Sequence, residues 1–285
     1  MLKIGVNTFL LTSPFTSEQV DIFGQFKAWG CDAVEIAVED AAYVDAGIIR
    51  QALDEHGLTC SSVCAAMGPG RDLRGTPAEQ QAAVEYITQA MEFMAQIDCP
   101  VMVGPLYSTV GRAEQTPRDE YRKQWDTVVP HLQRLAVRAD GLGVKLALEP
   151  LNRYETDFIN TCEQAVALVD DVGHQAIGIL LDTYHMNIEE KDSAAAIRKA
   201  AHRLLHVHAC GCDRGAPGGD HIDWDSIREA LKEVNYRGSL VIESFTPAVK
   251  VIAKAASIWR DFEPSREDIA IKGTAFLRNH FMTGF

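Results

Sequence analysis

The sequence predicts an α/β protein in which a single (β/α)₈ barrel, the TIM-barrel architecture, spans residues 1–285. Short β-branched apolar runs alternate with longer amphipathic segments from one end of the chain to the other, as in a parallel sheet built from βα units. No Pro- or Ser-rich linker divides the chain. Such barrels commonly reach about 250 residues as one domain, so the length requires no second domain.

Eight apolar runs are the expected strands. They occupy Lys3–Asn7, Asp32–Ala37, Leu58–Ala65, Pro100–Gly104, Val144–Glu149, Ile177–Asp182, Leu204–Ala209 and Ser239–Ser244. Between them, segments such as Glu79–Ala95 and Glu120–Ala139 repeat apolar residues at three- and four-residue intervals, which predicts outer helices. A glycine just before a strand is typical of a left-handed helix C-cap or an αβ turn, and five positions fit: Gly30, Gly57, Gly143, Gly173 and Gly238.

A doubly wound open sheet is the alternative architecture. It normally has a glycine-rich phosphate turn after its first strand, whereas Asn7 is followed by TFLLTSP. The segment MGPGRDLRG, which starts at Met67, matches neither common phosphate-loop pattern. We therefore expect it to be a flexible βα loop, and the barrel remains the predicted fold.

Composition and charge narrow the class of partner. The formal net charge of −13 disfavours nucleic acid and anionic lipid, because both are bound through clustered Lys and Arg. No segment approaches the roughly 20 apolar residues that span a bilayer, and MLKIGVNTFL lacks the features of a secretion signal. The seven cysteines include no CxxC pair, so we expect reduced thiols and a cytoplasmic protein. Cys210 and Cys212 flank one glycine, but structural zinc normally needs a second ligand pair.

Four potential metal ligands lie at the ends of four consecutive predicted strands. Glu149, Asp182, His208 and Glu243 fall at or near the carboxyl ends of strands five to eight, which converge on one mouth of a barrel. Each alone has an ordinary explanation, such as a helix cap, an ion pair or packing. Their occurrence at one level of adjacent strands favours a shared divalent cation. The oxygen-rich set suits Mn²⁺ best, with Mg²⁺ or Co²⁺ as alternatives.

Other polar residues lie near these strands. His206 should point the same way as His208 but lie deeper, where we expect a hydrogen-bonded core role. His185 follows Asp182 on the expected loop, where it could contact a ligand. We expect Glu189 and Glu190 to start or cap the next helix.

At these residues the sequence resembles the D-tagatose/D-psicose (allulose) 3-epimerase family of the xylose-isomerase-like barrels. The resemblance covers essentially the whole chain, and its most specific blocks are LEPLNRYETDFINT from Leu148, LDTYHMNIEE from Leu181, the strand of His208, and VIESF followed by IWR at Ile258. It implies a homodimer or homotetramer and a small sugar as partner. By motif it implies metal ligands at Glu149, Asp182, His208 and Glu243, an acid/base pair formed by Glu149 and Glu243, and substrate contacts at Glu155, His185 and Arg214.

Two segments depart from that family. ACGCDRGAPGGDHIDW, from Ala209 to Trp224, lacks an acidic and a second polar residue that usually precede the Arg-Gly pair. GPLYSTVGRAEQTP, from Gly104, lacks a Trp that often walls the pocket. Both changes concern substrate contacts, so the reaction type is better specified by the sequence than the sugar is.

The resemblance implies inversion at C3 of a free ketohexose or ketopentose of the D-tagatose, D-psicose or L-ribulose type. Glu149 and Glu243 would act on opposite faces, one removing the C3 proton and the other delivering one, while the metal stabilises the enediolate. Alternatives on the same barrel are an aldose–ketose isomerase, a cyclic polyol-ketone dehydratase, a phosphosugar epimerase that uses Arg214, a metal-dependent endonuclease, and a binding protein without catalytic activity.

Overall fold

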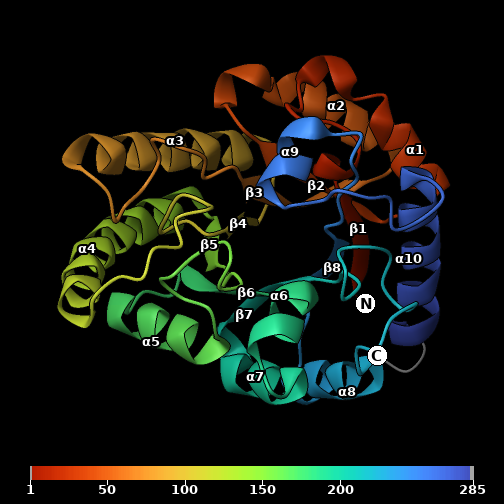
Figure 1. Cartoon of the computed structure of the whole chain (residues 1–285). Coiled ribbons are helices and arrows are strands. Elements are labelled where there is room, and N and C mark those ends of the chain that lie inside the picture. The colour runs from red at the N-terminus through yellow and green to blue at the C-terminus, as the bar shows by residue number, and fades with distance from the viewer. Residues whose placement is uncertain (1, 283–285) are drawn as a thin grey trace.

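A computed structural model describes residues 2–282 and shows a closed barrel of eight parallel strands (Figure 1). The strands pair in chain order, and the last pairs with the first, so the barrel has no open edge. The strands are β1 Lys3–Asn7, β2 Ala33–Val38, β3 Thr59–Ala65, β4 Val101–Gly104, β5 Lys145–Leu148, β6 Ile177–Asp182, β7 Leu204–His208 and β8 Ser239–Ile242. The predicted fold class is confirmed.

Helices surround the barrel, while the short helices α6 and α9 lie inside this ring in Figure 1. The α-helices are α1 Ile22–Ala28, α2 Ala46–His56, α3 Pro77–Gln96, α4 Arg118–Leu142, α5 Cys162–Val172, α6 Thr183–Glu189, α7 Ser193–Ala200, α8 Trp224–Glu233, α9 Lys250–Ala255 and α10 Arg266–Phe281. Both α6 and α9 follow the carboxyl ends of strands, so they sit at the mouth where a barrel carries its chemistry.

The expected element boundaries hold to within a few residues. Strands β5, β7 and β8 end one or two residues earlier than predicted, so Glu149 and Glu243 are the first residues beyond β5 and β8. Helix α3 begins before the predicted Glu79 because Thr76 and Glu79 form a reciprocal capping box around Pro77. Local capping chemistry therefore sets a limit that apolar spacing alone does not show.

Four of the five predicted turn glycines have left-handed backbones. Gly30, Gly57, Gly143 and Gly173 all have positive φ, whereas Gly238 does not. A Cβ on Gly238 would lie 2.3 Å from the Tyr236 hydroxyl, so glycine is needed there for close packing. The αβ turn before β8 is present, but it requires glycine for steric reasons and not for a left-handed backbone.

The segment that follows β3 is a βα loop, as expected, and ion pairs tie it to distant parts of the chain. Asp72 accepts from Arg112 at 2.8 Å, and the buried Arg74 donates to Asp157 at 2.6 Å. Arg71 donates from Nη1 to two main-chain carbonyls. Glycine content alone could not reveal these partners, because they lie up to 83 residues away in the chain.

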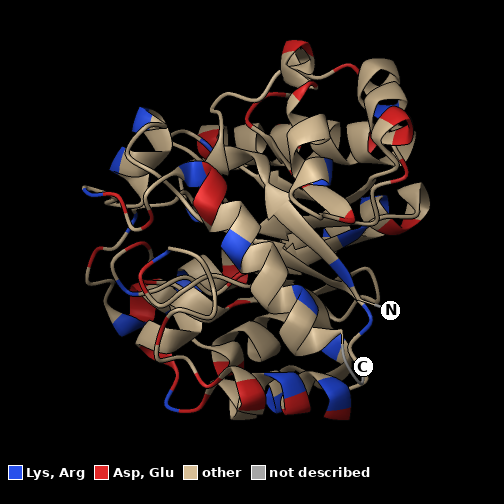
Figure 2. Ribbon diagram, turned by 90° about the vertical axis from the view of Figure 1, so that its right-hand side faces the viewer, with Lys and Arg blue, Asp and Glu red and all other residues tan. Residues whose placement is uncertain are grey.

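The surface carries charges of both signs. Figure 2 shows acidic and basic residues interspersed over the outer helices, while the strands are mostly free of charge. All seven cysteines are unpaired thiols, as predicted, and only Cys212 is not buried. Within residues 2–282, no helix combines the length and the hydrophobicity that crossing a membrane requires.

Candidate active site

The four predicted metal ligands lie together at the mouth of the barrel. Asp182 and His208 are the last residues of β6 and β7, and Glu149 and Glu243 directly follow β5 and β8. All four are buried, and one ligand atom from each lies within 4.8 Å of the others. The level predicted from strand ends is therefore the level at which the side chains meet.

The spacing of these atoms fits a divalent cation. His208 Nδ1 lies 3.6 Å from Glu149 Oε1, 3.8 Å from Asp182 Oδ2 and 3.2 Å from Glu243 Oε2. Ligand atoms about 2.1 Å from one octahedral ion lie roughly 3 to 4 Å apart. His208 Nδ1 and Glu149 Oε1 are also buried without a hydrogen-bond partner among the described residues, a costly state that a shared cation relieves. The three carboxylates and one imidazole suit Mn²⁺, Mg²⁺ or Co²⁺.

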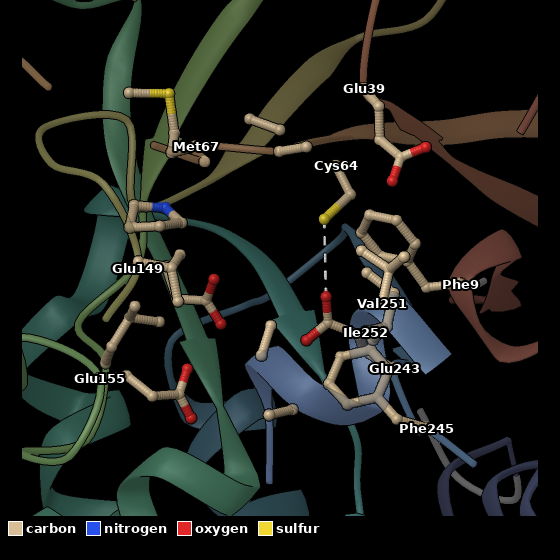
Figure 3. A pocket seen from close by; sticks show the side chains of 18 of the residues that line it. Phe9, Glu39, Cys64, Met67, Glu149, Glu155, Glu243, Phe245, Val251 and Ile252 are labelled. Atoms are coloured by element: carbon tan, nitrogen blue, oxygen red, sulfur yellow. Dashed lines mark hydrogen bonds between the residues drawn. The ribbon is translucent and has the colours of Figure 1, made fainter. Parts of the chain in front are cut away.

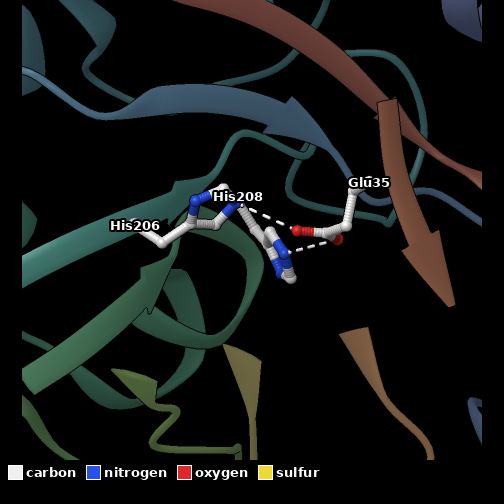
Figure 4. Close-up of side chains that lie close together, drawn as sticks. All are labelled: Glu35, His206 and His208. Atoms are coloured by element: carbon white, nitrogen blue, oxygen red, sulfur yellow. Dashed lines mark hydrogen bonds and ion pairs between the residues drawn. The ribbon is translucent and has the colours of Figure 1, made fainter. Parts of the chain in front are cut away.

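A buried carboxylate that the sequence analysis did not identify holds the histidine of this cluster. Glu35, on β2, is fully buried, and its carboxylate faces two imidazoles (Figure 4). Its Oε1 is 2.9 Å from His208 Nε2 and its Oε2 is 3.0 Å from His206 Nε2. Because Nε2 of His208 faces Glu35, Nδ1 is the nitrogen that faces the other carboxylates.

Two more side chains complete the bonding of Glu35. Asn7 Nδ2 donates to Oε1 at 2.7 Å and Ser62 Oγ donates to Oε2 at 2.5 Å. Each carboxylate oxygen thus has two donors, which saturates its lone pairs. The predicted core role of His206 is confirmed, since its ring is buried and bonded to Glu35. An acidic residue inside the apolar run AVEIAV is the signal that could have revealed this network.

Burial and neighbouring charges shift the pKa values of the clustered side chains in different directions. Burial, reinforced by the nearby charge of Glu243, raises the pKa of Glu149 to about 8. Burial also raises the pKa of Asp182, but the Arg214 guanidinium outweighs it and holds the pKa below its usual value. Burial lowers the pKa of His208, yet the carboxylates of Glu243 and Glu35 hold it well above normal. The site concentrates negative charge that a cation compensates.

The three predicted substrate-contacting residues line the same cavity. His185 lies in the first turn of α6, and not on a loop as expected. The main-chain N–H of Asn152 donates to His185 Nδ1 at 3.0 Å, while His185 Nε2 lies 3.0 Å from Arg214 Nη2 and 3.7 Å from Glu149 Oε1. Asn152 Nδ2 also donates to Glu155 Oε1 at 2.8 Å. Asn152, within the LEPLNRYE block, therefore positions two of the predicted residues, a role that the sequence did not show.

Arg214 lies directly against the candidate metal ligands. Its Nη1 is 2.5 Å from Asp182 Oδ2 and 3.2 Å from Glu243 Oε2. The guanidinium is held between the Tyr184 and Phe245 rings, at 4.5 and 4.9 Å from their centroids. Its backbone has a φ of 70°, an uncommon left-handed conformation for a side chain of this size. The bend in the loop from Ala209 to Trp224 thus places the positively charged Arg214 guanidinium inside the site.

Cys210, in the same loop, packs against the residues of the site. Cys210 is buried, and its thiol donates to the Glu243 carbonyl at 2.7 Å. Neither Cys210 nor Cys212 belongs to a group of potential metal ligands among the described residues. Cys210 thereby supports the backbone that presents Glu243.

The expectation for Glu189 and Glu190 is wrong. Glu189 is the last residue of α6 and pairs with Arg153 at 2.9 Å. Glu190 accepts from the amide of Cys162 at 2.7 Å, so it stabilises the start of α5, while Asp192 caps α7. A carboxylate at the end of one helix can satisfy the amino end of a helix that precedes it in the chain, which spacing cannot predict.

A cavity of about 270 Å³ opens over the cluster. Figure 3 shows Glu149 and Glu243 on either side of it, with Glu155 toward one end and Glu39 toward the other. Much of its wall is apolar and includes Phe9, Val251 and other carbon-rich side chains. Two carboxylates facing one space can act on opposite sides of a bound molecule.

The fold and this cluster define a (β/α)₈ barrel with a candidate divalent-metal centre at its mouth. The family model of the xylose isomerase-like TIM barrels matches residues 23–280. A probable ketose 3-epimerase of Synechocystis sp. is 32% identical over 99% of this chain and 98% of its own. A ketose 3-epimerase of Arthrobacter globiformis is 31% identical, covering 98% and 96%. The chain therefore belongs to the xylose isomerase-like TIM barrel family and, within it, to the group of ketose 3-epimerases.

Solved structures give the same result. A D-allulose 3-epimerase from Methylomonas sp., crystallised in complex with D-allulose, has a TM-score of 0.90 and 28% identity, covering 98% of this chain and 97% of that one. The resemblance inferred from the sequence motifs is confirmed, as is the class of enzyme, a sugar epimerase.

Proposed function

We propose that the protein is a metal-dependent ketose 3-epimerase that inverts C3 of a free ketohexose or ketopentose of the D-tagatose, D-psicose or L-ribulose type. The observation that carries this proposal is the placement of Glu149 and Glu243, which line one cavity and both lie beside His208 Nδ1. Similarity to curated ketose 3-epimerases supports the choice of C3. Inversion needs a base on one face of the carbon and an acid on the other, which two such carboxyls supply.

In this mechanism Glu149, Asp182, His208 and Glu243 would hold the cation. When bound, the cation supplies Lewis acidity to the sugar oxygens next to the reacting carbon. One of Glu149 and Glu243 takes the proton from C3, and the other, protonated, gives a proton to the opposite face. The reverse reaction exchanges their roles, and the resulting protonation states are restored by exchange with solvent.

The substrate is oriented by the groups around Glu155. Glu155 would accept a hydrogen bond from the O1 hydroxyl, and His185 Nε2 and Arg214 would contact O2. Asn152 fixes both Glu155 and His185 before a sugar binds, which reduces the entropic cost of reaching the reactive geometry. The apolar wall excludes water from the reacting carbon.

Proton exchange at C3 tests this proposal. The metal-loaded protein is incubated in deuterated water with D-allulose, D-tagatose and L-ribulose, and NMR follows deuterium at each carbon. We expect exchange at C3 with conversion to the C3 epimer, and we expect Glu149→Gln and Glu243→Gln each to reduce the rate of epimerisation by at least about 100-fold with the fold retained. Glu163→Gln, at an exposed carboxylate paired with Lys199, is the matched control.

Other outcomes would contradict specific parts of the proposal. Normal C3 epimerisation by either glutamine variant would exclude a two-base mechanism. If the wild-type protein catalyses exchange only at C1 or C2 of the sugar, the reaction is instead an aldose–ketose isomerisation.

We further propose Mn²⁺ as the native metal, a homodimer or homotetramer as the assembly, and the cytoplasm as the location. The oxygen-rich ligand set supports Mn²⁺ over zinc. Metal analysis of the purified protein and its mass in solution test the first two assignments.

A further inference from the structure

One end of the cavity has a polar group that the proposed reaction does not use. Glu39 directly follows β2 and lines the same cavity as Glu149 and Glu243. In Figure 3 its carboxylate lies on the side of Cys64 and Phe9, away from Glu155. The cavity therefore has a carboxylate at each end, with the candidate acid/base pair between them.

The Glu39 carboxylate is held on one side and incompletely bonded on the other. Its Oε1 accepts from Ser13 Oγ at 2.5 Å, and its main-chain carbonyl accepts from Arg71 Nη1 at 2.8 Å. Its Oε2 is buried and has no hydrogen-bond partner among the described residues. Partial burial raises the pKa of this carboxyl, in keeping with an unmet need for donors. A donor from a ligand would satisfy this oxygen.

The surroundings of Glu39 favour a neutral donor. The apolar side chain of Phe9 lies next to Glu39, and Val251 and Ile252 line the same side of the cavity. Among the described residues that line the cavity, Arg214 is the only Arg or Lys, and it is paired with Asp182. A phosphate would meet a carboxylate and carbon here, without a cation to neutralise it.

The nearest other cation is already engaged. Nη1 of Arg71 donates to the carbonyls of Glu39 and Ala66, and its guanidinium lies 3.9 Å from the centre of the Tyr86 ring. Arg71 is not among the residues that line the cavity. Its geometry supports the loop and does not present a phosphate site.

We propose that Glu39 accepts a hydrogen bond from the terminal hydroxyl of a free ketose and disfavours a substrate that carries a phosphate at that carbon. This inference rests on the proposed function, which places C3 between Glu149 and Glu243 and O1 at Glu155. The longer arm of the sugar, from C4 to C6, then extends toward Glu39. Glu39 thus selects an unphosphorylated six-carbon ketose.

Binding, measured separately from turnover, tests this role. Calorimetric titration of the metal-loaded protein compares D-allulose, 6-deoxy-D-allulose and D-allulose 6-phosphate in the wild type, Glu39→Leu and Glu39→Gln. We expect the wild type to bind the 6-deoxy and 6-phosphate sugars about tenfold or more weakly than D-allulose. Glu39→Leu should reduce the 6-deoxy ratio to less than about 3, because the acceptor is gone.

The glutamine variant separates charge from hydrogen bonding. Glu39→Gln keeps an acceptor for Ser13 and a polar group for the hydroxyl, so it should retain most of the 6-deoxy ratio while its 6-phosphate ratio falls severalfold. Glu114→Leu, which removes an exposed carboxylate from the segment between β4 and α4, should leave both ratios as in the wild type.

Each remaining outcome decides against a stated claim. A 6-deoxy ratio in Glu39→Leu equal to that of the wild type would overturn the role of Glu39, as would equal wild-type affinity for the free and phosphorylated sugars. Wild-type binding without C3 exchange would refute the epimerase proposal alone, since the binding ratios still measure Glu39. Absence of binding by all three sugars would overturn both.

Discussion

Replacing Glu35 with glutamine removes one acceptor from a carboxylate with four donors. Oε1 of Glu35 faces His208 Nε2 at 2.9 Å and Asn7 Nδ2 at 2.7 Å, and Oε2 faces His206 Nε2 and Ser62 Oγ. A glutamine has one accepting oxygen, so in either orientation its amide N–H₂ meets an imidazole nitrogen that is otherwise a donor. That ring must then carry its proton on Nδ1 or turn away.

The expected effect is on metal affinity. When the amide faces His208, a proton on Nδ1 blocks the nitrogen that faces Glu149 and Glu243. Loss of such an outer hydrogen bond typically weakens metal binding about 10- to 100-fold. The unsatisfied buried donor also lowers the free energy of unfolding by about 1–3 kcal/mol.

Competition with a fluorescent chelator measures Mn²⁺ affinity, and urea denaturation of the metal-free protein measures stability. Glu92→Gln, at a surface carboxylate paired with Arg138, is the control and should match the wild type in both assays. A folded Glu35→Gln protein that matches the wild type in both Mn²⁺ affinity and stability would refute the assigned network, because either orientation of the amide leaves a buried donor without an acceptor.

Two further predictions concern the scaffold. Asp157→Asn should lower the free energy of unfolding at pH 7 by about 2 kcal/mol, because Arg74 is buried while Asp157 is partly exposed. Burial raises the pKa of Asp157, but the hydrogen bonds from Thr116 and Arg74 outweigh burial and lower it. The ion pair therefore stabilises the protein above about pH 4, and this stabilisation is lost as the pH falls. A difference between the urea denaturation curves of the wild type and Asp157→Asn that does not shrink below about pH 4 would contradict this. Gly178→Ala should cost at least about 1–3 kcal/mol, since its Cβ would lie 2.5 Å from the Arg203 carbonyl. Gly141→Ala, with open space around it on α4, should not be destabilised in the same denaturation assay.

The sequence predicted those parts of the molecule that depend on local pattern. Apolar runs between turn residues identified all eight strands, because buried parallel strands need continuous hydrophobic side chains. The level of Glu149, Asp182, His208 and Glu243 followed from strand ends alone, since parallel strands converge at one mouth.

The unpredicted features depend on contacts between distant parts of the chain. The Glu35 carboxylate contacts His208, 173 residues away in the chain, and Glu190 accepts a hydrogen bond from the main-chain N–H of Cys162, 28 residues earlier. The role of Asn152 depends on its contact with His185 of α6, which only the folded structure shows. Polar pairing of this kind depends on side-chain geometry in the folded barrel, which no periodicity records.

The pairing of β1 with β8 has a consequence for how the protein becomes active during folding. Asn7 Nδ2 lies 3.3 Å from Glu243 Oε1, a contact between residues 236 positions apart. The last ligand and the first strand therefore meet only when the two ends of the chain have joined. A ribosome-bound or truncated chain that lacks β8 has three of the four candidate ligands but not the completed site, so we expect full affinity for a divalent cation only once the whole barrel has closed.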